Sequence, residues 1–95
     1  PTRPEVLAAY AASEYALDPQ RPSARAVELY TQVLKVNPNN GSALWVLGQA
    51  AQLAGDPARA REHWQRLLAL LPEESAMRAQ VQRAIDQAAG PADKP

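Results

Sequence analysis

The sequence predicts an all-α fold, a solenoid of two helix-turn-helix repeats followed by a C-terminal capping helix, with five helices in all. The strongest evidence is a spacing of 34 residues, which suits a pair of helices with their turns. Five residues recur at this spacing: Ala26, Tyr30, Val33, Leu34 and Pro38 are followed by Ala60, Trp64, Leu67, Leu68 and Pro72. Apolar residues with helical periodicity lie between proline and glycine positions that end helices.

The first two helices are predicted on either side of a loop with two prolines. We expect the first helix to run from Pro4 to about Ala16, and the loop to cover Asp18 to Pro22. Its apolar stripe is Val6, Leu7, Tyr10 and Ala11. The second helix starts near Ser23 and ends at Asn37, because the following proline disfavours helical dihedrals in that residue. Its expected buried residues are Ala26, Val27, Tyr30, Val33 and Leu34.

The remaining three helices follow from similar signals. After a turn at 39–42, the third helix carries Leu44, Leu47, Gly48 and Ala51. It stops at Gly55, which favours a left-handed cap. The fourth helix begins with Asp56 as N-cap and Pro57 at its first position, and ends before Pro72. The fifth helix, over 75–89, places Met77, Val81, Ala84, Ile85 and Ala88 on one face.

These elements divide the chain into a first repeat (1–40, with a longer internal loop), a second repeat (41–74), a capping helix (75–89) and a disordered tail (90–95). A strict 34-residue offset places Tyr10 opposite Leu44 and Glu14 opposite Gly48. We prefer an offset of 37 residues, which aligns Leu7 with Leu44 and Ala11 with Gly48 and so restores the order of a large aliphatic residue and a small one.

The second repeat resembles the tetratricopeptide repeat (TPR) consensus over 41–74, with weaker agreement over about 5–40. The residues that carry the resemblance are Leu44, Leu47, Gly48, Gly55, Asp56, Pro57, Ala60, Trp64 and Pro72. It implies a module that binds other proteins and is not an enzyme. We expect Gly48 and Ala60 at a close helix approach, and Tyr30 and Trp64 buried between helical pairs.

Composition narrows the possible functions. The 95 residues make one small domain with ten basic and ten acidic side chains, so it lacks the basic stripe that nucleic-acid binding needs. Without cysteine there is no thiol catalysis and no disulfide. The longest apolar run, Leu67 to Leu71, is too short to cross a bilayer. We therefore expect no direct membrane contact by these 95 residues. The chain begins at Pro1, and we expect a domain excised from a longer protein.

No catalytic, metal-binding or cofactor-binding residues are predicted. His63 is the only histidine and has no second ligand one helical turn away. The neighbouring acids Glu73 and Glu74 favour a helix N-terminus and have no predicted pocket for acid–base work. Glu62 and Arg66 form an i, i+4 pair on a helix surface.

In TPR arrays the first helix of each pair lines a concave groove, which predicts a partner-binding site here. The predicted groove residues are Ser42, Trp45, Gln49 and Gln52 on the third helix, and Ala8, Ala12 and Tyr15 on the first. Trp45 is a candidate anchor for a partner. The alternative is that it packs on Tyr10, Tyr15 or the loop. The groove lacks the lysines and asparagines of a carboxylate clamp, and it suits an amphipathic helix.

A narrower resemblance is to the C-terminal TPR region of c-type cytochrome biogenesis proteins of the CycH/CcmI type. The segments that carry it are 7–11, 43–51, 55–60, 63–72 and 81–85. It implies a periplasmic, chaperone-like domain of a protein anchored in the inner membrane, which binds the C-terminal helix of apocytochrome c. The alternatives are a general TPR scaffold of a cell-envelope or secretion complex, a cytoplasmic location, or a regulatory module of an enzyme.

Overall fold

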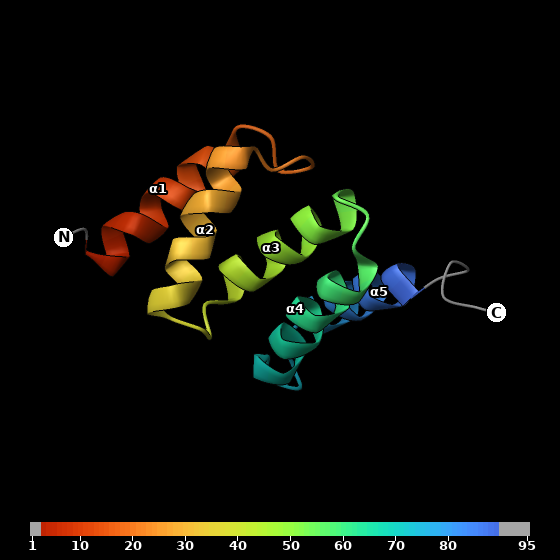
Figure 1. Cartoon of the computed structure of the whole chain (residues 1–95). Coiled ribbons are helices and arrows are strands. Elements are labelled where there is room, and N and C mark those ends of the chain that lie inside the picture. The colour runs from red at the N-terminus through yellow and green to blue at the C-terminus, as the bar shows by residue number, and fades with distance from the viewer. Residues whose placement is uncertain (1–2, 90–95) are drawn as a thin grey trace.

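The computed structural model describes residues 3–89, which form five α-helices and no strand. The helices are α1 (Pro4–Ala16), α2 (Ala24–Val36), α3 (Gly41–Leu53), α4 (Pro57–Leu70) and α5 (Met77–Ala89). Each helix packs against the next one in the chain, so the helices follow one another from α1 at one end to α4 and α5 at the other (Figure 1). The predicted all-α helical-repeat fold is confirmed. The predicted tail, 90–95, lies outside the described residues.

Side chains cap the starts of three helices. Ser23, Asn40 and Asp56 each accept a hydrogen bond from the backbone N–H three residues later, at 2.9–3.1 Å. These bonds satisfy donors that the first turn of a helix leaves without a partner. The start of α1 differs, since Arg3 makes no side-chain capping bond and Pro4 occupies the first turn. This helix therefore begins with less stabilisation from side-chain capping than α2, α3 and α4.

The turn between α3 and α4 follows the predicted glycine cap. Gly55 has a φ of 82°, a conformation that side chains disfavour. Its N–H donates to the carbonyl of Gln52 at 3.1 Å, and the N–H of Asp56 donates to Ala51 at 2.9 Å. This pair of bonds is a Schellman motif, which satisfies the last carbonyls of α3. Asp56 then caps α4 directly, so the hairpin between the two helices is tight.

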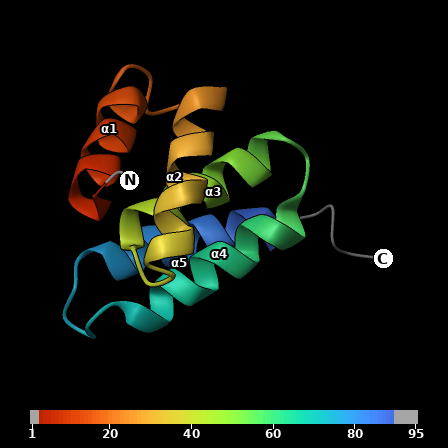
Figure 2. The ribbon, with the colours of Figure 1, turned by 60° about the vertical axis from the view of Figure 1, so that its left-hand side comes forward.

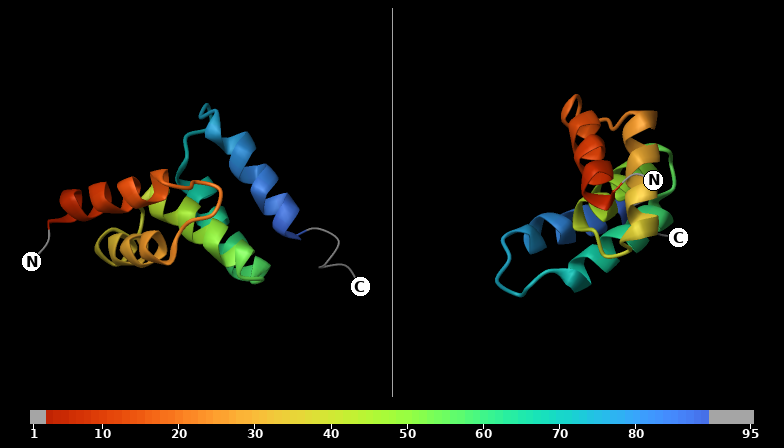
Figure 3. Two further views of the ribbon diagram at one scale, coloured as in Figure 1. Left: turned by 90° about the horizontal axis from the view of Figure 1, so that it is seen from above. Right: turned by 90° about the vertical axis from the view of Figure 1, so that its left-hand side faces the viewer.

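The core consists of two clusters that meet at α3. The N-terminal cluster comprises Leu7, Ala11, Leu29, Tyr30, Val33, Ala43, Val46 and Leu47. The C-terminal cluster comprises Leu44, Ala51, Ala60, Trp64, Leu67, Val81, Ile85 and Ala88. Leu34 and Trp45 pack against both. Because α3 contributes to both clusters, it joins the α1–α2 pair to the α4–α5 pair, as Figures 2 and 3 show.

The two aromatic residues of the 34-residue spacing are buried as predicted. Trp64 is 4% exposed in the C-terminal cluster, and Tyr30 is 3% exposed in the N-terminal cluster. The predicted close approach at Gly48 is also present, because a Cβ there would overlap the indole ring of Trp64. The small residue is thus required by the large one opposite it.

The predicted apolar stripe of the first helix is only half correct. Leu7 and Ala11 are buried, as the 37-residue offset expects. Val6 and Tyr10, however, are 40% and 58% exposed, and neither belongs to the N-terminal cluster. Met77, at the start of α5, was also expected on an apolar face and is exposed. On α2, Leu29 is buried although the predicted buried residues did not include it.

Two arginines connect α4 and α5 at both ends of their hairpin. Arg78, near the start of α5, donates from Nη1 to the carbonyls of Leu68 and Leu71, at 3.0 and 2.9 Å. Arg61, near the start of α4, donates to the carbonyl of Ala88 at 3.0 Å. Each arginine thereby satisfies carbonyls at the C-terminus of the other helix, where a positive charge is favoured.

Candidate functional site

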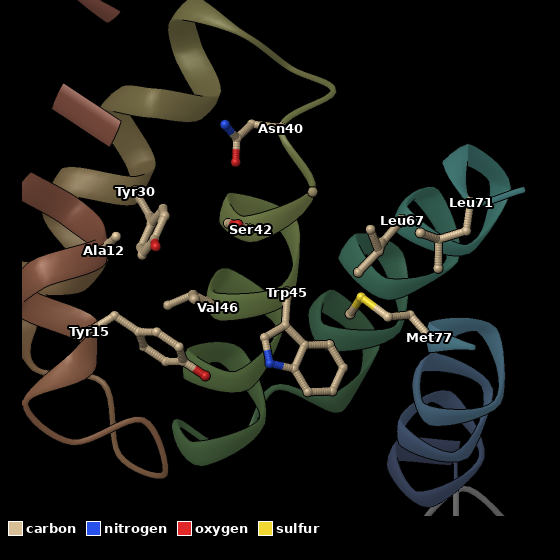
Figure 4. A pocket seen from close by; sticks show the side chains of 11 residues that line it. Ala12, Tyr15, Tyr30, Asn40, Ser42, Trp45, Val46, Leu67, Leu71 and Met77 are labelled. Atoms are coloured by element: carbon tan, nitrogen blue, oxygen red, sulfur yellow. The ribbon is translucent and has the colours of Figure 1, made fainter. Parts of the chain in front are cut away.

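A hollow with a volume of about 560 Å³ lies where the two pairs of helices meet at α3. All five helices or their flanking turns contribute to its lining, which consists of Ala12, Tyr15, Tyr30, Asn40, Gly41, Ser42, Trp45, Val46, Leu67, Leu71 and Met77. None of these residues is charged. Figure 4 shows Tyr15 and Tyr30 on one side of this groove and Leu67, Leu71 and Met77 on the other, with Trp45 between them.

Trp45 is half-buried at the centre of the groove. Its ring packs against that of Trp64, with centroids 5.6 Å apart and an interplanar angle of 36°. The indole N–H of Trp64 donates to the backbone carbonyl of Trp45 at 3.2 Å, so both the ring and the backbone of Trp45 are fixed. The repeat pattern did not predict this contact of Trp45 with α4, the second helix of its pair. Trp45 contacts that helix with one part of the ring and lines the groove with another.

Tyr15 is held in place on the α1 side of the groove. Its hydroxyl donates to Oε1 of Gln49 at 2.8 Å, and Nε2 of Gln49 donates to the carbonyl of Pro19 at 3.0 Å. The ring of Tyr15 also lies edge-on to Tyr30, with centroids 6.2 Å apart. Burial, with a smaller contribution from Tyr15, raises the pKa of the Tyr30 phenol. The Tyr30 phenol therefore stays uncharged at neutral pH.

The predicted groove residues do not all lie together. Ala12, Tyr15, Ser42 and Trp45 line the groove. Ala8 lines a neighbouring hollow of about 220 Å³, which shares Asn40 with the groove and extends it towards the start of α1. Gln49 connects α3 to Tyr15 and the α1–α2 loop, and Gln52 is exposed on α3 outside both hollows. Contact of these residues with a partner stays a prediction.

Sequence reasoning missed the wall formed by α4 and α5. Leu67 lies near the end of α4, Leu71 directly follows that helix, and Met77 begins α5. Helical periodicity identifies a face of one helix, whereas these residues reach the groove because the α4–α5 turn folds back beside α3. The one signal in the sequence was Met77 itself, an apolar residue at the start of the fifth predicted apolar stripe.

The rest of the described chain shows few other groups that could form a functional site. Within residues 3–89 no three His, Cys, Asp or Glu side chains gather closely enough to hold a metal ion. His63 lines a separate hollow between α2 and α4, beside Arg59. Burial and then the charge of Arg59 lower its pKa below the usual value. In the same range, no helix has the length and apolar character needed to span a membrane.

These features define a helical-repeat module with an uncharged groove formed by both halves of the molecule. The Tetratricopeptide repeat family model matches residues 23–85, about two thirds of the chain. The protein belongs to the tetratricopeptide repeat family, whose domains generally act as protein-protein interaction scaffolds without catalytic activity. Comparisons with curated proteins and with solved structures gave no match.

Proposed function

We propose that this domain binds the apolar face of an amphipathic helix in the groove centred on Trp45, and that its partner is the C-terminal helix of an apocytochrome c. The observation that carries the proposal is the lining of the groove, which is apolar on both sides and contains no charged side chain. Such a surface suits helix-in-groove recognition, in which apolar side chains spaced i, i+3/i+4 and i+7 serve as anchors.

The dimensions of the groove agree with this mode of binding. A volume of about 560 Å³ accommodates a few anchoring side chains of a helix, while its polar face remains in water. Trp45, Tyr15 and Met77 offer aromatic and thioether surface, which adapts well to aliphatic or aromatic anchors. Because Trp45 and Tyr15 are already fixed by Trp64 and Gln49, little conformational freedom is lost on binding.

The identity of the partner rests on the resemblance to c-type cytochrome biogenesis proteins. In the proposed setting, the domain lies in the periplasm as part of a membrane-anchored protein and holds the apocytochrome before haem attachment. The absence of cysteine suits this role, since a free thiol could form mixed disulfides with the cysteines of the client.

Isothermal titration calorimetry with a synthetic peptide of a cytochrome c C-terminal helix tests the proposal. We expect micromolar affinity, because the peptide must fold when it binds. Trp45→Ala should weaken binding by about 2 kcal/mol, a typical hot-spot cost. Leu53→Ala is the matched control, since Leu53 is an exposed apolar residue of α3 outside the groove lining, and it should bind as the wild type does.

Two further comparisons test the identity of the partner and the position of the binding site separately. A scrambled peptide of the same composition, which lacks the apolar stripe, should not bind. If amphipathic helices of unrelated sequence bind as tightly as the cytochrome peptide, the domain is a general TPR scaffold, for instance of a cell-envelope or secretion complex. Equal affinity of the wild type and Trp45→Ala would remove the groove from the binding site.

A further inference from the structure

The hydroxyl of Tyr30 is a polar group without a protein partner at the groove. The side chain of Tyr30 is 3% exposed and lines the groove from α2, in the space between α1 and α3 (Figure 4). Its hydroxyl makes no hydrogen bond within residues 3–89. In the same range, every fully enclosed side-chain oxygen or nitrogen has a hydrogen-bond partner. The Tyr30 hydroxyl is therefore not enclosed, and it is accessible from the groove that its side chain lines.

The second tyrosine of the groove differs in this respect. The hydroxyl of Tyr15 donates to Oε1 of Gln49 at 2.8 Å, while Nε2 of the same amide donates to the carbonyl of Pro19 at 3.0 Å. The ring of Tyr30 lies edge-on to that of Tyr15, with centroids 6.2 Å apart, but its hydroxyl takes no part in these bonds. Tyr30 thus offers a ligand a hydroxyl that the described part of the protein leaves unused.

This hydroxyl restricts which helices fit the groove. Water can bond to it as long as no partner covers the groove. A helix that covers the groove with aliphatic side chains alone displaces that water and leaves the hydroxyl without a partner, which costs free energy. Nearly all buried polar groups in native structures have a hydrogen-bond partner. A partner that fits the groove well must therefore bring a polar group to this position.

We propose that the partner helix carries one glutamine or asparagine within its apolar face, and that the carbonyl oxygen of this amide accepts a hydrogen bond from the Tyr30 hydroxyl. The proposal rests on the proposed function, since it names the chemistry of the helix that the groove would bind. Tyr30 is a suitable donor because burial and the neighbouring Tyr15 raise the pKa of its phenol, which keeps its proton at neutral pH.

An uncharged amide suits this position better than a carboxylate or a hydroxyl. None of the side chains that line the groove is charged, so a carboxylate would lose water without gaining a counter-charge. Serine and threonine in a helix often bond to the backbone carbonyl four residues earlier, which engages their hydroxyl. The oxygen of an amide is free of such bonds. Its N–H groups can bond to water or to Ser42, whose exposed side chain lines the same groove.

A series of amphipathic peptides tests the proposal by isothermal titration calorimetry. The parent peptide has leucine at every apolar position, and each leucine in turn is replaced by glutamine or by glutamate. At one position glutamine should bind the wild type at least as tightly as leucine does, and more tightly than glutamate. Tyr30→Phe keeps the buried ring and removes the hydroxyl. It should weaken binding of this glutamine peptide about fivefold, the ratio for one neutral hydrogen bond, and should not weaken binding of the parent peptide.

Tyr10→Phe is the matched control. Tyr10 is an exposed tyrosine of α1 that does not line the groove, so the loss of its hydroxyl should leave the preference between glutamine and leucine unchanged. Tighter binding of glutamate than of glutamine at the sensitive position would overturn the proposal, as would a preference that Tyr30→Phe does not alter at any position. If no peptide of the series binds the wild type, the proposed function fails and this proposal fails with it. If the peptides bind, Trp45→Ala weakens them and Tyr30→Phe changes nothing, only this proposal fails.

Thermal unfolding of the free protein provides a test that needs no ligand. Because the Tyr30 hydroxyl makes no hydrogen bond within residues 3–89, Tyr30→Phe should unfold at the wild-type temperature or above it. Tyr15→Phe, which removes the hydrogen bond to Gln49, should unfold at a lower temperature. A clear loss of stability in Tyr30→Phe would show that the hydroxyl is already bonded in the free protein, and would contradict its availability to a ligand.

Discussion

The two halves of the molecule are secured in different ways. The α4–α5 hairpin buries Trp64 against α3, and two arginines connect its helix ends to each other. In the α1–α2 pair, α1 buries only Leu7 and Ala11, begins without a side-chain cap and exposes Val6 and Tyr10. The family match also begins at residue 23, which leaves α1 outside it. We infer that the α4–α5 pair, which follows the repeat consensus, supplies the stable framework. The α1–α2 pair, whose first helix departs from the consensus, supplies a less stable wall of the groove.

The largest expected effect is the loss of an aromatic residue from the stable half. Trp64→Ala should destabilise the domain by about 3–5 kcal/mol, because it removes a nearly fully buried indole and leaves a cavity beside Gly48. Leu7→Ala in the other half should cost only about 2 kcal/mol, since α1 lies at an open edge that can close around the gap. Denaturant unfolding measures both, and a larger cost for Leu7→Ala would reverse the comparison.

An intermediate effect is expected at the connection between α4 and α5. Arg78→Ala should cost about 1–2 kcal/mol, because the carbonyls of Leu68 and Leu71 lose a charged donor. Arg83→Ala is the control on the same helix, where Arg83 is exposed, and it should change stability by less than about 0.5 kcal/mol. Equal melting temperatures for the two variants would show that the arginine contacts add nothing to the stable half.

The smallest effect is a pH dependence from His63. Burial and the nearby Arg59 lower its pKa in the folded state below the value of 6.5 expected when unfolded. The unfolded chain therefore binds more protons near this pH, and stability falls as the pH drops through the range below 6.5. Thermal unfolding at pH 7.5 and at pH 5.5 should show a decrease that is smaller in His63→Gln. The same decrease in both proteins would assign it to other groups.

The sequence predicted the helices well because local residues determine their ends. Pro38 and Gly55 restrict the backbone where α2 and α3 end, and Asp56 caps the start of α4. The structure shows boundaries within one or two residues of the expected ones. The choice between Tyr10 and Leu7 as core residues was harder. Residues 6 and 10 and residues 7 and 11 are both i, i+4 pairs, so periodicity alone does not say which pair faces the neighbouring helix.

The groove was predicted only in part because its walls come from distant segments. Trp45 and Tyr15 follow from the repeat pattern, since both lie on first helices of a pair. The stacking of Trp45 on Trp64, and the approach of Leu71 and Met77, depend on how the α4–α5 hairpin folds back. Such contacts arise from tertiary packing, which a single sequence does not display.

The most direct test of the account is amide hydrogen exchange in the free protein and in the protein bound to the helical peptide. In the free protein we expect α1 to exchange fastest of the five helices and α4 to exchange slowly, because local stability follows buried contacts. Peptide bound between Tyr15 and Trp45 should then slow exchange most strongly in α1, since the ligand connects the weaker half to the stable one. Equal exchange of α1 with and without a bound peptide would contradict a groove shared by the two halves.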